Sequence, residues 1–269
     1  RWATKEQACS DLAVRAGRAL FERVPHNPSR ITHCLLATIS GDFPSPPTSP
    51  LVLHQLGLSG VSAFDLGAAC AGFLNGLQTA ACLQEVFGGD QLLIASDIRS
   101  KFLNPKDLAT SILFGDAAVA AFISSDSANA KYKYLGATQF TDGSVADIIK
   151  IPMGGSRFPF RDQTDATENT IVMKDGAALF FKAIEGMEFV CRELLQALNL
   201  SLDDIDYLVP HQANLLMVKE LAKRLNKTAS CVEIVQTMGN TSGTSTGLAL
   251  EHLPSQFALQ PRQKALLVS

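Results

Sequence analysis

Apolar residues in the first half of the chain predict helices and strands that alternate. Over residues 5–24 they recur at helical spacing and form one stripe, made of Cys9, Leu12, Ala13, Ala16 and Leu20. Short apolar runs predict buried strands at 32–40, 61–67, 91–96 and 117–124, and a helix from about Cys70 to Phe87. The stretch 41–50 is rich in proline and serine, so we expect a loop there.

The second half repeats this order. The pattern predicts a helix at about 177–199, a strand at 205–210, a helix from about Gln212 to Leu225, and a strand at 231–235. A helix, a short turn, a buried strand and a loop thus occur at 5–40 and again at 177–210, which indicates an internal structural duplication. The polar stretch 124–133 divides the chain into an N-terminal half, 1–128, and a C-terminal half, 129–269.

Strands that alternate with helices are typical of an α/β fold with largely parallel sheets covered by helices. In such sheets, ligands usually bind at the carboxyl ends of the strands. Polar side chains at those ends are therefore the first candidates for chemistry.

Composition excludes several classes of protein. The 269 residues are 46% hydrophobic and 18% charged, with a net charge of −3, so neither nucleic acid nor an anionic membrane is an expected partner. The longest apolar stretch, 112–123, contains an aspartate and is too short to span a bilayer. The chain starts at Arg1 and stops within an apolar run, so we expect it to be a fragment of a longer protein.

The six cysteines are scattered and form no C-x-x-C pair. This usage predicts reduced thiols in the cytoplasm, without a disulfide framework. Neither a metal site nor a cofactor is expected.

One cysteine stands out in AFDLGAACAGF, residues 63–73, because Cys70 follows a predicted strand and opens a predicted helix. A helix amino terminus favours negative charge, so a thiol there can have a pKa well below its usual value and act as a nucleophile. The alternative is a small buried hydrophobic residue, since free cysteines are commonly core. Gly72 and Gly76, four residues apart, would allow this helix to pack closely on a neighbour.

Two further candidates also lie at element ends. His211, in VPHQAN, follows the strand at 205–210, where an imidazole could donate to a reacting oxygen or transfer a proton, or simply bond to backbone. Asn240, in MGNTSGTSTG, could donate its amide to a developing negative charge, or serve only turn chemistry. Together with Cys70, they place three reactive groups at strand or helix ends.

These residues resemble a known family. DLGAACAGFLNGL, VPHQAN and GNTSGTS are similar, in order and spacing, to the three active-site motifs of β-ketoacyl-acyl carrier protein synthase III, in the thiolase superfamily. FGDAA (114–118) and the stretches 43–58 and 173–184 fit the same pattern, so the resemblance covers essentially the whole chain. It implies a thiolase-like fold with duplicated halves, five αβαβα layers, and a homodimer.

The resemblance also implies a two-stage acyl transfer without a cofactor. Cys70 would take the acyl group from an acyl-CoA or an acyl-acyl carrier protein. Malonyl-acyl carrier protein would then lose CO₂ while His211 and Asn240 stabilise the enolate oxygen. Condensation would give a 3-oxoacyl-acyl carrier protein and initiate fatty acid or polyketide synthesis.

Four more residues match substrate-binding positions of the family. Phe43 matches a residue that reaches across the dimer, or it packs at the interface only. Gly176 and Phe180 match the channel wall, although Phe180 also shares an apolar helix stripe that favours a core role. Asn214 matches a polar residue near the site, with helix capping as the alternative.

Some positions depart from the family pattern. Leu108 and Leu216 stand where the family commonly has arginines for CoA and the carrier protein, which favours a carrier-bound or unusual donor. Nearby basic residues could face an acidic carrier protein or form a solvated helix face: Lys219, Lys223, Arg224 and Lys227.

Three other functions stay open. GTSTG, residues 243–247, formally matches the G-x-S-x-G motif of serine hydrolases, but Ser245 has a polar lead-in and only His252 follows it. The chain could also be a non-catalytic partner subunit. A related condensing or acyl-transfer enzyme of secondary metabolism could use the same Cys, His and Asn.

Overall fold

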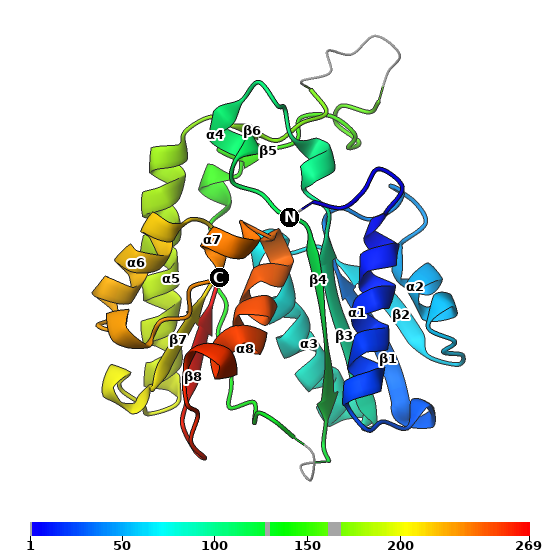
Figure 1. The fold of residues 1–269 in the computed structure, drawn as a ribbon, viewed down its shortest axis with the longest axis vertical. Helices are drawn as coiled ribbons and strands as arrows, with labels where there is room; N and C mark the ends of the chain where they lie inside the picture. Colours follow the sequence, from blue (N-terminus) through cyan, green and yellow to red (C-terminus); the bar gives the residue numbers. More distant parts are fainter. Residues whose placement is uncertain (1, 127–129, 161–167) are drawn as a thin grey trace.

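Helices and sheets alternate in five layers across the molecule (Figure 1). The structure is a computed structural model that describes residues 2–126, 130–160 and 168–269. From right to left in Figure 1, the layers are α1 (Cys9–Arg23) with α2 (Ser49–Gln55), a four-stranded sheet, α3 (Gly72–Phe87) with α8 (Ser245–Gln256), a two-stranded sheet, and α5 (Gly176–Ala197) with α6 (Leu215–Arg224). The predicted αβαβα layering is confirmed.

The larger sheet belongs to the first half of the chain. Its strand order is β2-β1-β3-β4, with bounds Ser62–Leu66, Ile31–Ala37, Asp90–Asp97 and Ala117–Ser124. The first three strands are parallel, whereas β4 runs antiparallel to β3, which corrects the expectation of largely parallel pairing at this edge. No long helix crosses the sheet between β3 and β4, so the chain re-enters from the edge at which β3 ended.

Alternate side chains of each strand enter different cores. Leu36 and Ile94 pack with α1 and α2, while Leu35 and Leu93 face α3. All four have 0% exposure, and burying such a side chain stabilises the fold by about 1.5–3 kcal/mol. The sheet is apolar on both faces because helices cover both, as its continuous apolar runs predict.

The smaller sheet belongs to the second half. Strands β7 (Tyr207–Pro210) and β8 (Ala265–Val268) are parallel, and they lie between α8 on one side and α5 with α6 on the other. The order α5 then β7 repeats the order α1 then β1, as the predicted duplication requires. The predicted boundary between residues 128 and 129 lies outside the described residues.

Short elements complete the fold. Strands β5 and β6 form a small antiparallel pair, and α4 and α7 are single turns; their bounds are Ile149–Lys150, Val172–Met173, Leu108–Ser111 and Val235–Met238.

Two local expectations were wrong. The predicted strand at 231–235 is reduced to one bridge between Cys231 and Leu208, because the side chain of Gln212 accepts the backbone N–H groups of residues 234 and 235. The end of the predicted loop at 41–50 is helical instead, since α2 begins at Ser49 with a proline in its first turn, a position that proline tolerates.

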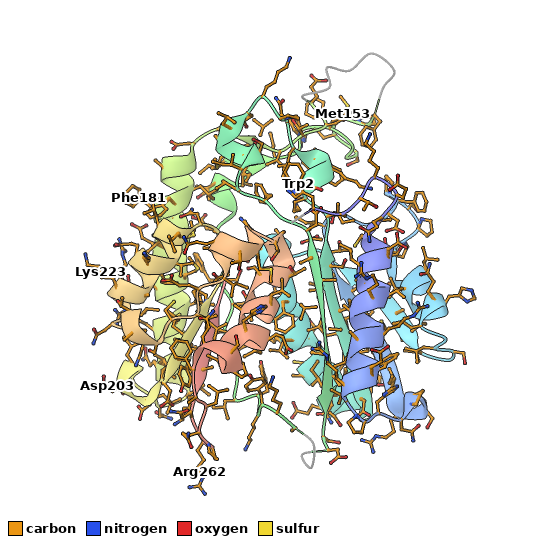
Figure 2. The ribbon with its side chains drawn as sticks, viewed as in Figure 1. Trp2, Met153, Phe181, Asp203, Lys223 and Arg262 are labelled. Carbon is orange, nitrogen blue, oxygen red and sulfur yellow. The ribbon has the colours of Figure 1, made fainter. Side chains whose placement is uncertain are left out.

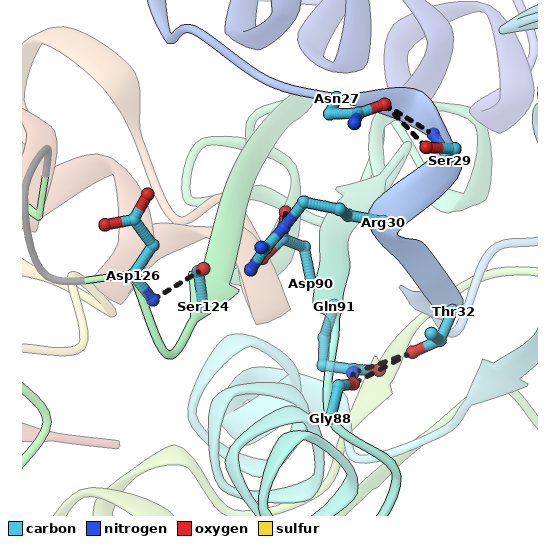
Figure 3. Close-up of polar contacts among 9 residues, drawn as sticks. All are labelled: Asn27, Ser29, Arg30, Thr32, Gly88, Asp90, Gln91, Ser124 and Asp126. Atoms are coloured by element: carbon cyan, nitrogen blue, oxygen red, sulfur yellow. Dashed lines mark hydrogen bonds and ion pairs between the residues drawn. The ribbon is translucent and has the colours of Figure 1, made fainter.

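Polar contacts fix the amino-terminal edge of the parallel strands (Figure 3). Arg30 pairs with Asp90 at 3.2 Å, and Gln91 donates to Thr32 and to the carbonyl of Gly88, each at 2.9 Å. These contacts connect the starts of β1 and β3 and set their register.

At the carboxyl edge, Asp97 joins the two halves. This carboxylate ends β3 and is 1% exposed. It accepts hydrogen bonds from Thr38, Ile39 and Ser40 at 3.2, 3.0 and 3.0 Å, and from the backbone N–H of Gly243, 146 residues away, at 3.0 Å. A single side chain therefore fixes the turn before α8 against the first sheet.

We expect the Asp97→Ala variant to lose about 3 kcal/mol or more of unfolding free energy, because four donors, three of them on buried residues, would lose a charged acceptor. Urea unfolding measures the change, and Asp203→Ala, at an exposed aspartate, is the matched control with a change below about 0.5 kcal/mol. Equal stability of the two variants would show that Asp97 does not hold the halves together.

Candidate active site

Cys70 lies in a tight turn between β2 and α3. The 3₁₀ turn Ala69–Ala71 carries it, and α3 begins two residues later at Gly72, so the predicted helix starts slightly later than expected. Ala69 has φ of +44°, in the left-handed region that a residue with a Cβ rarely occupies. Such strain is often found at functional sites.

The environment of the thiol differs from the expectation. Cys70 is partly exposed as a residue, but burial of its sulfur, together with the carboxylate of Asp97, raises the pKa of Cys70 to about 11. Arg99, a hydrogen bond with Ser242 and the backbone act in the opposite direction and only moderate the rise. The lowered pKa that a helix start could give is not observed, because desolvation outweighs the groups that favour the thiolate.

His211 extends the second sheet by one residue. It follows β7 directly and donates its backbone N–H to the carbonyl of Val268, the last residue of β8, at 2.7 Å. Its ring Nδ1 lies 2.5 Å from Ser245 Oγ. Ser245 Oγ also accepts the backbone N–H of Gln212 at 3.2 Å. When Ser245 donates its own proton to Nδ1, the proton of the neutral ring is on Nε2, which makes Nε2–H a hydrogen-bond donor.

Burial lowers the pKa of His211 to about 4, so the imidazole is neutral near neutral pH. An unfolded histidine binds its proton near pH 6.5. Between these pH values the unfolded chain holds a proton that the folded chain excludes. The stability contribution is therefore fully present above pH 6.5 and is lost as the pH falls towards 4.

This shift predicts a pH-dependent stability. On lowering the pH from 6.5 to 4, the wild-type protein should lose on the order of 3 kcal/mol more unfolding free energy than His211→Gln. Chemical denaturation at several pH values measures the difference, with the exposed His54→Gln as control. Parallel pH profiles for wild type and His211→Gln would contradict the account.

Asn240 is held in place by hydrogen bonds of its backbone and of its side-chain oxygen. Its N–H bonds to the carbonyl of Leu113 and its carbonyl accepts the N–H of Gly115, at 2.8 and 2.9 Å. Its side-chain Oδ1 accepts the N–H of Ser242 at 2.9 Å. Because Oδ1 is engaged, the amide orientation is fixed, and Nδ2 is left as a donor without a hydrogen bond to the described residues.

A six-residue segment, 240–245, brings the three candidates together. Asn240 begins it, Ser242 favours the ionised form of the Cys70 thiol, and Ser245 binds the His211 ring. The segment touches the cysteine turn directly, since a Cβ added to Gly243 would lie 2.6 Å from the carbonyl oxygen of Ala69.

The end of β8 makes a second link between the cysteine and the histidine. Ser269 Oγ donates to the carbonyl of Cys70 at 2.8 Å, next to Val268, which accepts from His211.

Ser245 does not have the geometry of a hydrolase nucleophile. It is 0% exposed and begins α8 after a 3₁₀ turn, whereas the G-x-S-x-G motif needs a strand leading into an exposed serine. Its contact with His211 is that of a residue that orients the ring.

The four residues expected to bind substrate lie in different settings. Phe43 is 64% exposed on the loop before α2, and Gly176 is the exposed first residue of α5. Phe180 packs against the core between α5 and α6. Asn214 caps α6, with Oδ1 accepting the N–H of Met217 at 2.9 Å. The structure brings none of them into a described contact with Cys70.

The four basic residues on α6 and just after it divide into two pairs. Arg224 pairs with Glu220 and Glu188, and Lys227 donates to the carbonyl of Ile205. The other two, Lys219 and Lys223, line a surface hollow of about 460 Å³ together with Phe180, Phe181, Leu216 and Glu220. Figure 2 shows Phe181 and Lys223 on the same side of the molecule.

The sequence did not single out three polar residues around the site. Asp97 and Arg99, at the end of β3, and Gln212, beside His211, are buried. The only feature of the sequence that could have indicated them is that each is a charged or polar residue at the end of a strand.

Neither a metal centre nor a membrane span is found in the part of the chain that the structure describes. No three His, Cys, Asp or Glu side chains there are placed to share a metal ion, and no helix there is both long and apolar enough to cross a bilayer.

Known proteins share this architecture. The family model for 3-oxoacyl-(acyl-carrier-protein) synthase III matches residues 64–143, and the model for its C-terminal part matches residues 195–269. The 3-oxoacyl-(acyl-carrier-protein) synthase III from Aquifex aeolicus, a solved structure, superposes with a TM-score of 0.86 at 28% identity, covering 99% of this chain and 82% of that one.

Two relatives are more similar in sequence. The 3-oxopimeloyl-(acyl-carrier-protein) synthase of Rhodothermus marinus is 40% identical over 257 residues, which are 94% of this chain and 74% of that protein. The β-ketoacyl-(acyl-carrier-protein) synthase III of Oleidesulfovibrio alaskensis is 32% identical over 270 residues, covering 99% of this chain and 82% of that protein.

The layered fold and its neighbours define an enzyme of the thiolase fold. Within that class, the chain belongs to the β-ketoacyl-acyl carrier protein synthase III family.

Proposed function

We propose that the protein joins an acyl group to a malonyl thioester with loss of CO₂, using Cys70, His211 and Asn240. The observation that carries the proposal is the segment 240–245, which contains the carboxamide of Asn240, binds the imidazole of His211 through Ser245, and packs against the turn that carries Cys70. These groups come from sequence positions far apart.

In the first stage, the sulfur of Cys70 attacks the carbonyl carbon of the acyl donor. The new carbon–sulfur bond forms, the bond to the donor sulfur breaks, and the proton of Cys70 ends on the departing thiol of CoA or carrier protein. The start of α3 places a partial positive charge beside the sulfur, which favours the thiolate during attack.

In the second stage, malonyl-acyl carrier protein loses CO₂. The electron pair of the broken carbon–carbon bond passes to the thioester enolate, whose oxygen accepts hydrogen bonds from His211 Nε2 and Asn240 Nδ2. The carbanion attacks the acyl group on Cys70, the bond to sulfur breaks, and the released thiolate takes one proton from solvent. The product is a 3-oxoacyl-acyl carrier protein.

The neutral state of His211 suits this role. A protonated imidazole would be costly in so buried a site, and the lowered pKa keeps the ring uncharged. Ser245 fixes the tautomer that donates through Nε2. The ring therefore acts as a fixed donor towards negative charge that develops only during the reaction.

We further propose a homodimer in the cytoplasm. The exposed aromatic ring of Phe43 supports an interface at that loop, and the six unpaired cysteines suit a reducing compartment. Gly176 and Phe180 would line the substrate channel, and Asn214 would act through the capping of α6.

Purified protein incubated with malonyl-acyl carrier protein and a panel of acyl donors tests the function. The panel pairs CoA and carrier-protein thioesters and includes chains that end in a carboxylate, since the 3-oxopimeloyl product named for one relative has a carboxylate at its far end. Mass spectrometry should detect a 3-oxoacyl-acyl carrier protein with release of CO₂. Hydrolysis of every donor, or no product from any, would favour a different acyl-transfer enzyme or a non-catalytic partner subunit.

A further inference from the structure

Arg99 is a buried cation close to the candidate nucleophile. It lies two residues beyond the end of β3 and is 7% exposed. Among the residues that the structure describes, no other arginine or lysine is buried. A guanidinium group is practically always charged, so a full positive charge is enclosed beside the site.

The guanidinium group has no ionic partner in the described part of the chain. Its Nε and Nη1 atoms are buried and make no hydrogen bond, and its central carbon lies 5.7 Å from the centre of the Phe102 ring. The two nearby carboxylates bind other donors. Asp97 accepts the four hydrogen bonds from the turn after β1 and from Gly243. Asp116 accepts the backbone N–H groups of Arg99 and Ser100 at 2.7 and 2.8 Å.

A buried charge without partners is unfavourable for folding. Buried polar atoms in folded proteins nearly always have hydrogen-bond partners, so unsatisfied ones need an explanation. A ligand that supplies the missing acceptor would explain why an arginine occupies this position. The shape of the guanidinium group indicates the class of ligand, because its planar fork of N–H donors matches a carboxylate.

The position of Arg99 relative to Cys70 indicates which ligand that is. The charge of Arg99 acts on the Cys70 thiol, and the two residues also share Asp97 as a charged neighbour. Contacts in the fold also bring them close, since Gly243 donates its N–H to Asp97 at 3.0 Å and a Cβ added to Gly243 would lie 2.6 Å from the carbonyl oxygen of Ala69, next to Cys70.

We propose that Arg99 binds the carboxylate at the far end of the acyl donor, so that the enzyme selects donors derived from dicarboxylic acids. This inference rests on the proposed function, since it names the class of acyl group that Cys70 receives. Arg99 would set specificity without taking part in bond making or breaking.

The carboxylate of the malonyl thioester is the other possible source of this group. Decarboxylation requires that carboxylate to leave as neutral CO₂, and a buried ion pair would stabilise it in the ground state and slow its loss. The donor's terminal carboxylate keeps its charge throughout the reaction, so the ion pair can persist. The far end of the donor is therefore the better match.

Binding can be measured without turnover in a Cys70→Ala background. The probes are pantetheine thioesters of butanedioic, pentanedioic and hexanedioic acid, compared with the butanoyl, pentanoyl and hexanoyl thioesters by calorimetry. At least one carboxylated probe should bind about a hundredfold more tightly than its alkyl counterpart. Adding Arg99→Met should raise its Kd about a hundredfold and change that of the alkyl probe less than about threefold.

Two control variants and one melting measurement distinguish a role of Arg99 in ligand binding from a role in the stability of the fold. Arg99→Lys should keep part of the preference, because it retains the charge but not the fork. Arg15→Met removes an exposed arginine and should change nothing. Arg99→Met should melt at or above the wild-type temperature, since an unpaired buried charge gives no stability; a large drop would indicate a structural role and overturn the proposal.

Equal affinity for carboxylated and alkyl probes, or no binding of any carboxylated probe, would overturn the inference and leave the proposed function intact if condensation is observed. A higher KM for malonyl-acyl carrier protein in Arg99→Met, with donor preference unchanged, would assign Arg99 to the malonyl carboxylate instead and also overturn it. A preference for carboxylated probes in a protein that performs no condensation would refute the proposed function alone.

Discussion

Replacing Cys70 by alanine should abolish condensation, with a loss of about a thousandfold or more in turnover. In the proposed function this sulfur carries the acyl group covalently, and removing a nucleophile removes the step that depends on it. Formation of 3-oxoacyl-acyl carrier protein under saturating donor and malonyl thioester measures the effect. The fold should persist, because the turn Ala69–Ala71 is held by backbone contacts to Ser269 and Gly243.

Cys82→Ala is the matched control. This cysteine is exposed on α3, and its loss should leave turnover within about twofold of wild type. If Cys70→Ala retained a tenth of the wild-type rate, an acyl-Cys70 intermediate would be excluded.

Loss of either enolate donor has the second large expected effect. His211→Ala and Asn240→Ala should each slow decarboxylation of malonyl-acyl carrier protein by about 10²–10³, the range found when one preorganised oxyanion donor is removed. Release of labelled CO₂ measures this step by itself. Acylation of Cys70 should continue in both variants, since neither donor is assigned to the first stage.

Substitutions at residues remote from the segment 240–245 serve as controls. His54→Ala and Asn27→Ala remove the same side-chain types, from α2 and from the loop before β1, and should release CO₂ at the wild-type rate. Wild-type CO₂ release from His211→Ala and Asn240→Ala would remove their assigned role, whatever happens at Cys70.

Periodicity predicted most of the helices and strands, whereas the five-layer arrangement was implied by the family resemblance. The stripe on α1 and the continuous apolar runs of β1 and β3 identify buried faces, because a helix repeats every 3.6 residues and a doubly covered strand is apolar on both sides. It could not predict the direction of β4, since strand direction depends on where the chain re-enters the sheet. Nor could it predict α2, where helix formation begins at a proline within a loop-like composition.

The candidate site was predictable only through the order of its motifs. Cys70, His211 and Asn240 each had an ordinary structural explanation when taken alone. The thiol environment was beyond the reach of the sequence, because the raised pKa depends on the burial of the sulfur and on Asp97, 27 positions along the chain. The same limit applies to Arg99, whose missing partners become apparent only when every neighbouring carboxylate has been placed.

Mapping the acyl group on the enzyme tests the central claim most directly. The wild-type protein is incubated with the donor that gives most product, digested, and analysed by peptide mass spectrometry before and after addition of malonyl-acyl carrier protein. The account predicts one acylated peptide, the one containing Cys70, whose added mass disappears as 3-oxoacyl-acyl carrier protein forms. An acyl group on Ser245 or on any other residue, or an adduct on Cys70 that malonyl-acyl carrier protein does not discharge, would contradict it.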